Sequence, residues 1–115
     1  MKSDARGDKL RLTDILRACG RIKTYAAEGK SEFLSSLKTQ DAVVRNLEVI
    51  GGAAGKVSPS IRSANPGVPW AEMRGFSSYA KHEYWALDPE RLWAATQDIP
   101  SIELAVSKIR AELER

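Results

Sequence analysis

The segment RGFSSYAKHEYW, residues 74–85, carries the one histidine of this chain, His82, with Tyr84 two residues later. Histidine can give or take a proton near neutral pH. Metal-free RNA cleavage needs a base for the 2′-hydroxyl, an acid for the leaving 5′-oxygen and a cation beside the phosphate. His82 could make either proton transfer, and Arg74 could supply the cation. The alternative is an ordinary structural or surface histidine.

Aromatic residues are concentrated around this histidine. Five of the eight in the chain lie within 16 residues: Trp70, Phe76, Tyr79, Tyr84 and Trp85. Interleaved with Arg74, Lys81 and His82, they would suit single-stranded RNA, whose bases stack on rings and whose phosphates pair with cations. The alternative is that the two tryptophans and the phenylalanine are core residues.

The elements that must position these residues are predicted to be helices. Apolar residues recur at steps of three and four over residues 9–27 and again over 43–57, as on one face of a helix. No segment alternates polar and apolar residues as a strand would, and we find no internal repeat. We therefore expect one all-α domain over residues 1–115, a compact bundle of about five helices.

Later helices are predicted from their start signals. Pro69 suits the first position of a helix over 69–82. Asp88 before Pro89 signals another start, and the segment 98–115 gives a final helix. The loop before Pro69 can hold a single turn over 59–64.

A helix over 69–82 would place the candidate residues unequally. Ser78 would lie one turn before His82 on the same face. Arg74 would lie about 80° round and roughly 12 Å along the axis from His82, too far for direct contact within one helix. Arg74 and His82 could still line one groove or meet across a dimer interface.

Three glycines interrupt the helix predicted over 43–57. Gly51, Gly52 and Gly55 each cost about 1 kcal/mol relative to alanine in a helix interior. Close packing of another helix would explain them. Local fraying, or the loss of a functional side chain, are the alternatives.

Charge is unevenly spread in a chain with net charge +3 and pI near 9.2. Residues 1–23 hold seven Lys or Arg against three Asp, whereas residues 88–115 hold four basic against six acidic side chains. The basic first helix could face a polyanion such as RNA. A solvated, charged helix face is the plainer alternative.

Several function classes are disfavoured by composition. Cys19 is alone, so no intrachain disulfide can form, which fits a reducing cytoplasm. With one Cys and one His, a transition-metal site is not expected. No apolar run reaches about 18 residues, and the N-terminus lacks the apolar stretch of a signal peptide, so we expect a cytoplasmic protein without a membrane span.

Five segments together resemble the HepT-like branch of the HEPN superfamily. They are RLTDILRACGRIKTY, DAVVRNLEVIGGAAGK, NPGVPWAEMRGF, HEYWALDPERLW and DIPSIELAVSKI. The resemblance implies an all-α homodimer with a metal-independent ribonuclease centre, without cofactor, in a cleft at the dimer interface. It also implies a toxin whose antitoxin is a minimal nucleotidyltransferase, which can add AMP to the tyrosine of the His-x-Tyr motif.

Some residues match the family pattern and others depart from it. His82 falls on the family histidine and Tyr84 on the modified tyrosine. The family has Arg five residues before the histidine, followed by a polar residue such as Asn, where this chain has Ser77 and Ser78. Gly52 stands where the family tends to have Glu. Three polar positions expected around the cleft are thus reduced to small side chains.

These departures bear on activity. Arg74 could substitute for the missing arginine, and Tyr79 and Lys81 are also expected to line the cleft. Loss of a cation that stabilises phosphate charge raises the activation free energy by several kcal/mol, about as much as the loss of one or more hydrogen-bond donors of an oxyanion hole. We therefore expect weak or absent RNA cleavage. The alternative is a non-catalytic helical dimer that binds RNA or the antitoxin partner.

Overall fold

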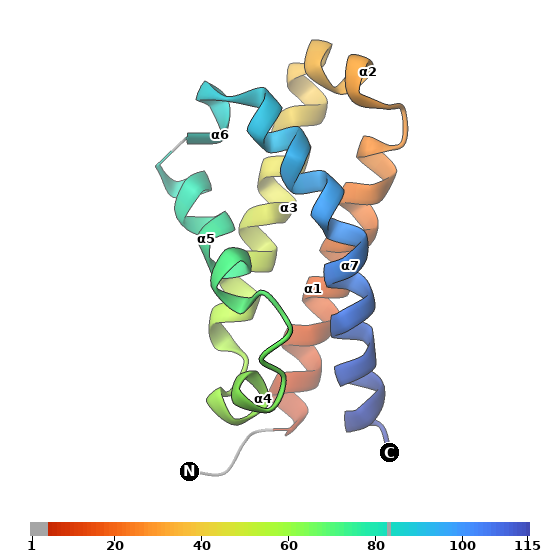
Figure 1. Ribbon diagram of the computed structural model, residues 1–115, viewed down its shortest axis with the longest axis vertical. Helices are drawn as coiled ribbons and strands as arrows, with labels where there is room; N and C mark the ends of the chain where they lie inside the picture. The colour runs from red at the N-terminus through yellow and green to blue at the C-terminus, as the bar shows by residue number, and fades with distance from the viewer. Residues whose placement is uncertain (1–4, 83) are drawn as a thin grey trace.

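The regular structure of this chain is entirely helical in the part described. The computed structural model describes residues 5–82 and 84–115, with the side chains of residues 5 and 84 outside that description. Within these residues the helices are α1 (Ala5–Ala26), α2 (Lys30–Ser35), α3 (Leu37–Lys56), α4 (Pro59–Ala64), α5 (Trp70–Lys81), α6 (Tyr84–Leu87) and α7 (Pro89–Leu113). The all-α prediction is confirmed (Figure 1).

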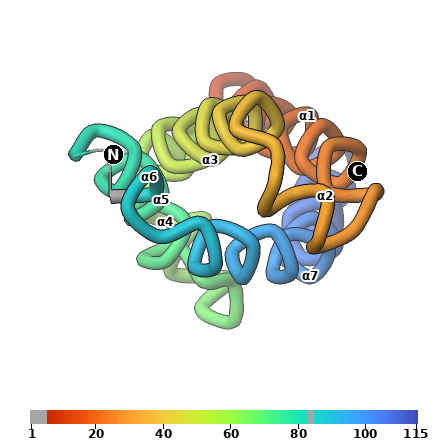
Figure 2. Tube along the Cα trace, turned by 90° about the horizontal axis from the view of Figure 1, so that it is seen from above, coloured from red at the N-terminus to blue at the C-terminus, as the bar shows by residue number. Residues whose placement is uncertain are grey.

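Four long helices form the bundle, and three short ones connect them. Seen from above, α3 lies between α1 and α5, and α7 packs along α1 (Figure 2). Helix α5 rests mainly on α3, with α6 and α7 closing the upper part of the molecule (Figure 1). No helix among the described residues is long and apolar enough to cross a membrane.

The core lies between α1, α3 and α7. Most of the stripe predicted on α1 is fully buried, since Leu12, Ile15, Cys19 and Ile22 are all 0% exposed. Its other two members, Leu16 and Ala26, are half-buried. Burying each large aliphatic side chain contributes about 1.5–3 kcal/mol, so this contact fixes α1 in the bundle. The facing residues on α3 and α7 are Val43, Leu47, Ile50, Ile99, Ile102 and Val106.

Polar side chains fix two helix starts. The Ser36 hydroxyl accepts a hydrogen bond from the Thr39 N–H at 3.1 Å, which caps α3. The Asp88 carboxylate accepts one from the Arg91 N–H at 3.1 Å and caps α7, as its sequence signal predicts. Between α1 and α2 the chain turns at Gly29, whose φ of 96° favours glycine.

A buried carboxylate ties the lower end of α1 to α4. Asp8 is 3% exposed, and its Oδ1 accepts a hydrogen bond from the Ser58 N–H at 2.8 Å. Its Oδ2 is buried without a hydrogen-bond partner among the described residues. One of the three acidic side chains near the N-terminus is therefore used inside the fold.

Two expected boundaries are wrong. The start predicted at residue 98 does not exist, because α7 runs through Pro100 without ending. Pro100 cannot donate to the Thr96 carbonyl, yet α7 buries Ile99 on one side of it and Ile102 on the other. Packing of that continuous stripe outweighs the lost hydrogen bond. At α5, Pro69 is the N-cap rather than the first helical residue.

The short helices explain the remaining difference from a five-helix bundle. The turn expected over 59–64 is α4. Helix α2 was not predicted, although its Phe33 is buried and lies 5.3 Å, centroid to centroid, from the Trp93 ring. Helix α6 has only four residues and carries no periodic signal.

Candidate active site

His82 lies at the carboxyl end of α5, where the helix stops. It is the C-cap residue, its backbone N–H donates to the Ser78 carbonyl at 3.1 Å, and its side chain is exposed. The backbone of Tyr84 opens α6, but the Tyr84 side chain and all of Glu83 lie outside the described residues. The predicted modification site is therefore placed by its backbone alone.

The two serines lie on different sides of α5. Ser78 is exposed and about 40° round the helix from His82, so both share one solvent face. Ser77 is half-buried, about 140° from His82, and its hydroxyl donates to the Arg74 carbonyl at 3.1 Å. The Ser77 hydroxyl is thus engaged with its own helix.

Helices α3 and α5 approach each other closely at Ser77. A Cβ atom placed on Gly51 would lie 2.6 Å from the Ser77 backbone nitrogen and 2.7 Å from its Cβ. A Cβ on Gly52 or Gly55 would meet nothing within 4 Å, and both residues are exposed. Close packing therefore explains Gly51 only, and the other two glycines leave α3 bare beside the α5 face.

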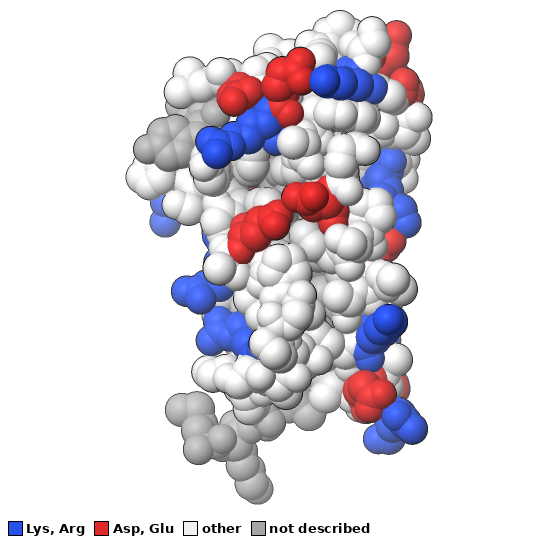
Figure 3. Space-filling view, in the orientation of Figure 1, with Lys and Arg blue, Asp and Glu red and all other residues white. Residues whose placement is uncertain are grey.

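Two basic residues of α5 lie beside this face. Arg74 and Lys81 are both exposed, and neither forms an ion pair within the described part of the chain. Helix geometry places them about 20° apart on the side of α5 nearer α3, with Arg74 about 80° from His82. In Figure 3 basic side chains line the edge of the molecule on the α5 side.

Tyr79 faces a groove between α5 and α7 instead. Its ring centroid lies 4.9 Å from that of Trp85, and the Arg91 guanidinium stands 5.2 Å from the Tyr79 centroid. The groove has a volume of about 380 Å³, and its lining includes Glu72 and Asp98 but not His82. Within one chain, Tyr79 therefore lines this groove and His82 does not.

A carboxyl pair in this groove was not predicted from the sequence. Burial raises the pKa of Glu72. A hydrogen bond that the protonated Glu72 carboxyl donates to Asp98, and the negative charge of Asp98, raise this pKa further. Acidic side chains are visible across the middle of the face in Figure 3. Glu72 and Asp98 lie on different helices, 26 positions apart in the sequence, so the spacing of residues along one helix does not predict that they meet.

The face carrying Ser78 and His82 is open. Ser77, Ser78 and His82 do not line any of five cavities found in the described part of the chain.

Metal ligands are not gathered at this face. The described residues contain no group of three or more His, Cys, Asp or Glu able to hold a metal ion. Cys19 is fully buried in the core, where burial first, and then the charge of Glu103, raise the pKa of its thiol to about 12. It is a packing residue at neutral pH.

Known proteins resemble this chain over most of its length. Residues 15–109 match the family described as ribonuclease HepT-like. The chain is 36% identical over 107 residues to "Probable ribonuclease HepT" of Thermococcus cleftensis, covering 91% of this chain and 97% of that protein. A "Putative RNase" of Methanocaldococcus jannaschii is 32% identical over 83% of this chain and 89% of its own length. No solved structure gives a significant match.

Proposed function

This chain belongs to the HepT-like ribonuclease family, and we propose that it binds RNA at the α5 face carrying Ser78 and His82 while cleaving it weakly or not at all. One observation carries the proposal. His82 is exposed on this face, but the positions one turn before it hold serines. Lys81, the residue next to His82 in the chain, points about 100° round the helix from it.

The proposed defect is electrostatic. His82 keeps a group able to transfer a proton near neutral pH. The serine hydroxyls can donate hydrogen bonds but bring no positive charge to a developing phosphate dianion. A missing charge-stabilising donor typically lowers kcat by about 10²–10³. Arg74 could compensate only in part, because its side chain starts on another side of α5.

The cleft itself is proposed to form between two copies of the chain. The family resemblance implies a homodimer, and the open face around His82 is compatible with that arrangement. Gly52 and Gly55 are exposed on α3 and leave room for a second copy, since a Cβ on either meets no atom within 4 Å. A second copy could then bring Arg74 or Lys81 near the partner's histidine, with Tyr79 and Gly52 also lining the cleft.

The partner proposed for this dimer is a minimal nucleotidyltransferase antitoxin in the cytoplasm. Tyr84, two residues after His82, is the proposed acceptor of AMP. An AMP group beside His82 would add negative charge where RNA phosphate must bind. Intact mass after co-expression with such an enzyme, in the wild type and in Tyr84→Phe, tests this part of the proposal.

Restoring the family residues is the direct test of the ribonuclease centre. We compare the chain as it stands with Ser77→Arg/Ser78→Asn, each with and without His82→Ala, on end-labelled RNA in excess EDTA. We expect cleavage only in the restored variant with His82 intact, at least about 10²-fold above the starting chain. Gly52→Glu can be added to the restored variant, because its Cβ position is open.

Each other result has a definite meaning. Cleavage by the starting chain that requires His82 would show that Arg74 or another cation already serves, and the proposed defect would be wrong. If the restored variant also fails to cut but still binds RNA, the non-catalytic binding dimer becomes the better description. That second candidate is favoured by the loss of charge at Gly52, Ser77 and Ser78 together.

A further inference from the structure

The outer face of α1 carries arginines that form no ion pair with the two aspartates of the same helix in the described part of the chain. Asp8 is turned inward and bonded to the Ser58 N–H at 2.8 Å. Asp14 is half-buried and joins no ion pair among the described residues. The basic excess predicted from the sequence is therefore not neutralised within α1.

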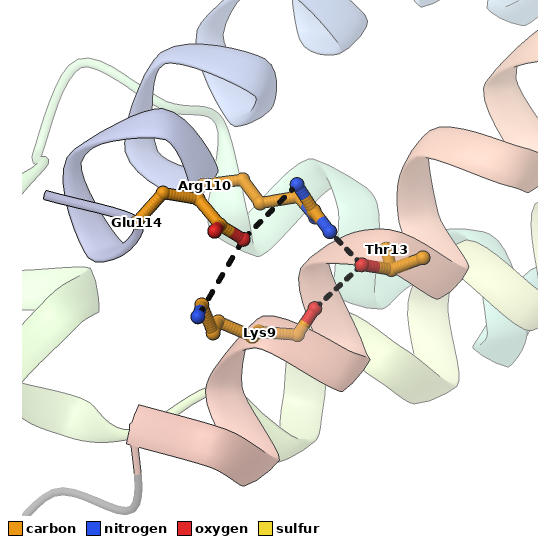
Figure 4. A network of polar contacts seen from close by, with 4 residues as sticks. All are labelled: Lys9, Thr13, Arg110 and Glu114. Carbon is orange, nitrogen blue, oxygen red and sulfur yellow. Dashed lines mark hydrogen bonds and ion pairs between the residues drawn. The ribbon is translucent and has the colours of Figure 1, made fainter.

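The lysines of α1 form ion pairs with α7 and its C-cap residue, whereas the arginines of α1 form none in the described part of the chain. Lys9 Nζ lies 3.5 Å from Glu114, which also pairs with Arg110 at 3.5 Å, and this network joins α1 to α7 (Figure 4). Lys23 pairs with Glu103 at 2.6 Å. The α1 side chains that form no ion pair within 4.0 Å in the described part of the chain are Arg6, Arg11, Arg17 and Arg21.

Three of these arginines form a stripe. At 100° per residue, Arg6, Arg17 and Arg21 fall within about 60° of one another and span about 22 Å of the helix. They lie opposite the stripe that α1 buries in the core. Leu10, 55% exposed, stands between them on the same side.

A shallow hollow opens at the upper half of this stripe. Its lining is Arg17, Gly20, Arg21, Thr24 and Tyr25, and its volume is about 330 Å³. A Cβ on Gly20 would meet nothing within 4 Å, so a polymer backbone can approach α1 closely there. Tyr25 is 37% exposed at the edge, which leaves its ring available for stacking.

We propose that this face of α1 binds the sugar–phosphate backbone of single-stranded RNA, with Arg17 and Arg21 on phosphates and Tyr25 stacked on a base. Unpaired arginines beside an exposed ring fit a stacked polyanion. An anionic membrane would call for a broader apolar face than Leu10 offers. The proposal rests on RNA being the partner in the proposed function and adds a second contact surface.

This surface is separate from the His82 face. Helix α3 lies between α1 and α5 in the view from above (Figure 2). RNA contacts on α1 would therefore hold a strand that extends beyond the cleavage position. Their loss should weaken binding without altering the chemistry at His82.

The test measures binding of fluorescently labelled oligouridine by anisotropy over a series of KCl concentrations. We compare Arg17→Ala/Arg21→Ala with Lys38→Ala/Lys108→Ala, which removes the same charge from exposed, unpaired lysines on α3 and α7. Losing two phosphate contacts on a single strand lowers the slope of log K against log salt by about 1.4 and weakens binding about 25-fold at ~0.1 M KCl. We expect these changes only in the arginine variant.

A second pair of variants addresses the hollow itself. Gly20→Ala and Gly20→Glu both add a Cβ into open space, so both should fold. Only Gly20→Glu places a carboxylate between Arg17 and Arg21. We expect it to weaken RNA binding to the level of the double arginine variant, while Gly20→Ala binds like the wild type. Circular dichroism confirms that each variant is helical.

Each outcome decides between the two proposals. If the wild type binds oligouridine and both arginine removal and Gly20→Glu leave the affinity unchanged, the α1 surface is wrong while the RNA function stands. If no variant, including the wild type, binds RNA at low salt, the proposed function itself fails. Stronger retention on vesicles of anionic lipid than on RNA, lost in the arginine variant, would make the stripe a lipid surface and overturn the proposal.

Discussion

Glu72 is a surface carboxyl whose charge is disfavoured by folding. Burial raises its pKa above the ordinary value of a glutamate, and the hydrogen bond it donates to Asp98 and the charge of Asp98 act in the same direction. The folded chain therefore binds this proton more tightly than the unfolded chain does. It follows that Glu72 makes the folded state less stable as pH rises through and above the range near 4.5.

Replacing this carboxyl should remove that pH dependence. We expect Glu72→Gln to raise the melting temperature modestly at about pH 7 and to raise it less near pH 4, where the wild-type carboxyl is mostly protonated in both states. Thermal unfolding by circular dichroism across this range measures the effect. Glu28→Gln, at an exposed residue in no ion pair among those described, is the control. A gain at pH 4 as large as at pH 7 would contradict the mechanism.

The contact between α3 and α5 is set by glycines that look alike in the sequence. Gly51 faces Ser77 so closely that an added Cβ would meet a backbone nitrogen at 2.6 Å, which no side-chain rotation can relieve. Gly52 and Gly55 face open space. The energetic cost of glycine in a helix is therefore offset by packing at one position only.

Alanine substitutions should separate the three positions. Gly52→Ala and Gly55→Ala should each stabilise the chain by about 1 kcal/mol, the difference in helix propensity. Gly51→Ala should destabilise it by about 1–3 kcal/mol, because α5 must move away from α3. Urea unfolding gives all three values. Equal stabilisation by the three substitutions would show that α5 does not pack at Gly51.

Sequence periodicity predicts the helices that carry a buried stripe. The pattern of α1 and the Asp88 cap of α7 appear in the structure where they were expected. The boundary at residue 98 was wrong because the local effect of Pro100 is weaker than the packing of α7 on both sides of it. Helix α2 has too few residues for a period, and it is held by Phe33 in the core.

The candidate site was predictable only where one helix sets the geometry. Ser78 and His82 share a face because they are one turn apart, and the structure places both on the solvent side of α5. The groove holding Tyr79 joins residues of α5, α6 and α7, so its carboxyl pair could not be inferred from spacing along one helix. The orientation of Ser77 toward Gly51 likewise depends on how α3 packs.

At the scale of the molecule, two separate faces offer contacts to other molecules. The outer face of α1 carries arginines without an ion pair among the described residues, and an exposed face of α5 carries Ser78 and His82. An RNA-binding dimer would use the first for phosphate contacts and the second to join the two copies. Finding which of the two faces a second copy covers in solution therefore tests this arrangement directly.

The dimer face can be blocked without touching the core. A tryptophan at Gly52 enters open space in the single chain, because no atom lies within 4 Å of its Cβ position, but it would stand in the way of a second copy. Gly20→Trp adds the same ring at an equally open position on the outer face of α1. A stable interface of usual size covers about 800 Å² on each partner, a small part of the 7017 Å² surface of this chain.

We expect a dimer for the wild type and for Gly20→Trp, and a monomer for Gly52→Trp, by light scattering coupled to size-exclusion chromatography. If the cleft around His82 forms between two copies, as proposed, Gly52→Trp introduced into the Ser77→Arg/Ser78→Asn variant should also abolish RNA cleavage. A monomeric wild type, or a Gly52→Trp variant that remains dimeric and active, would place the interface elsewhere. In that case the open face of α5 would have to bind RNA on a single chain.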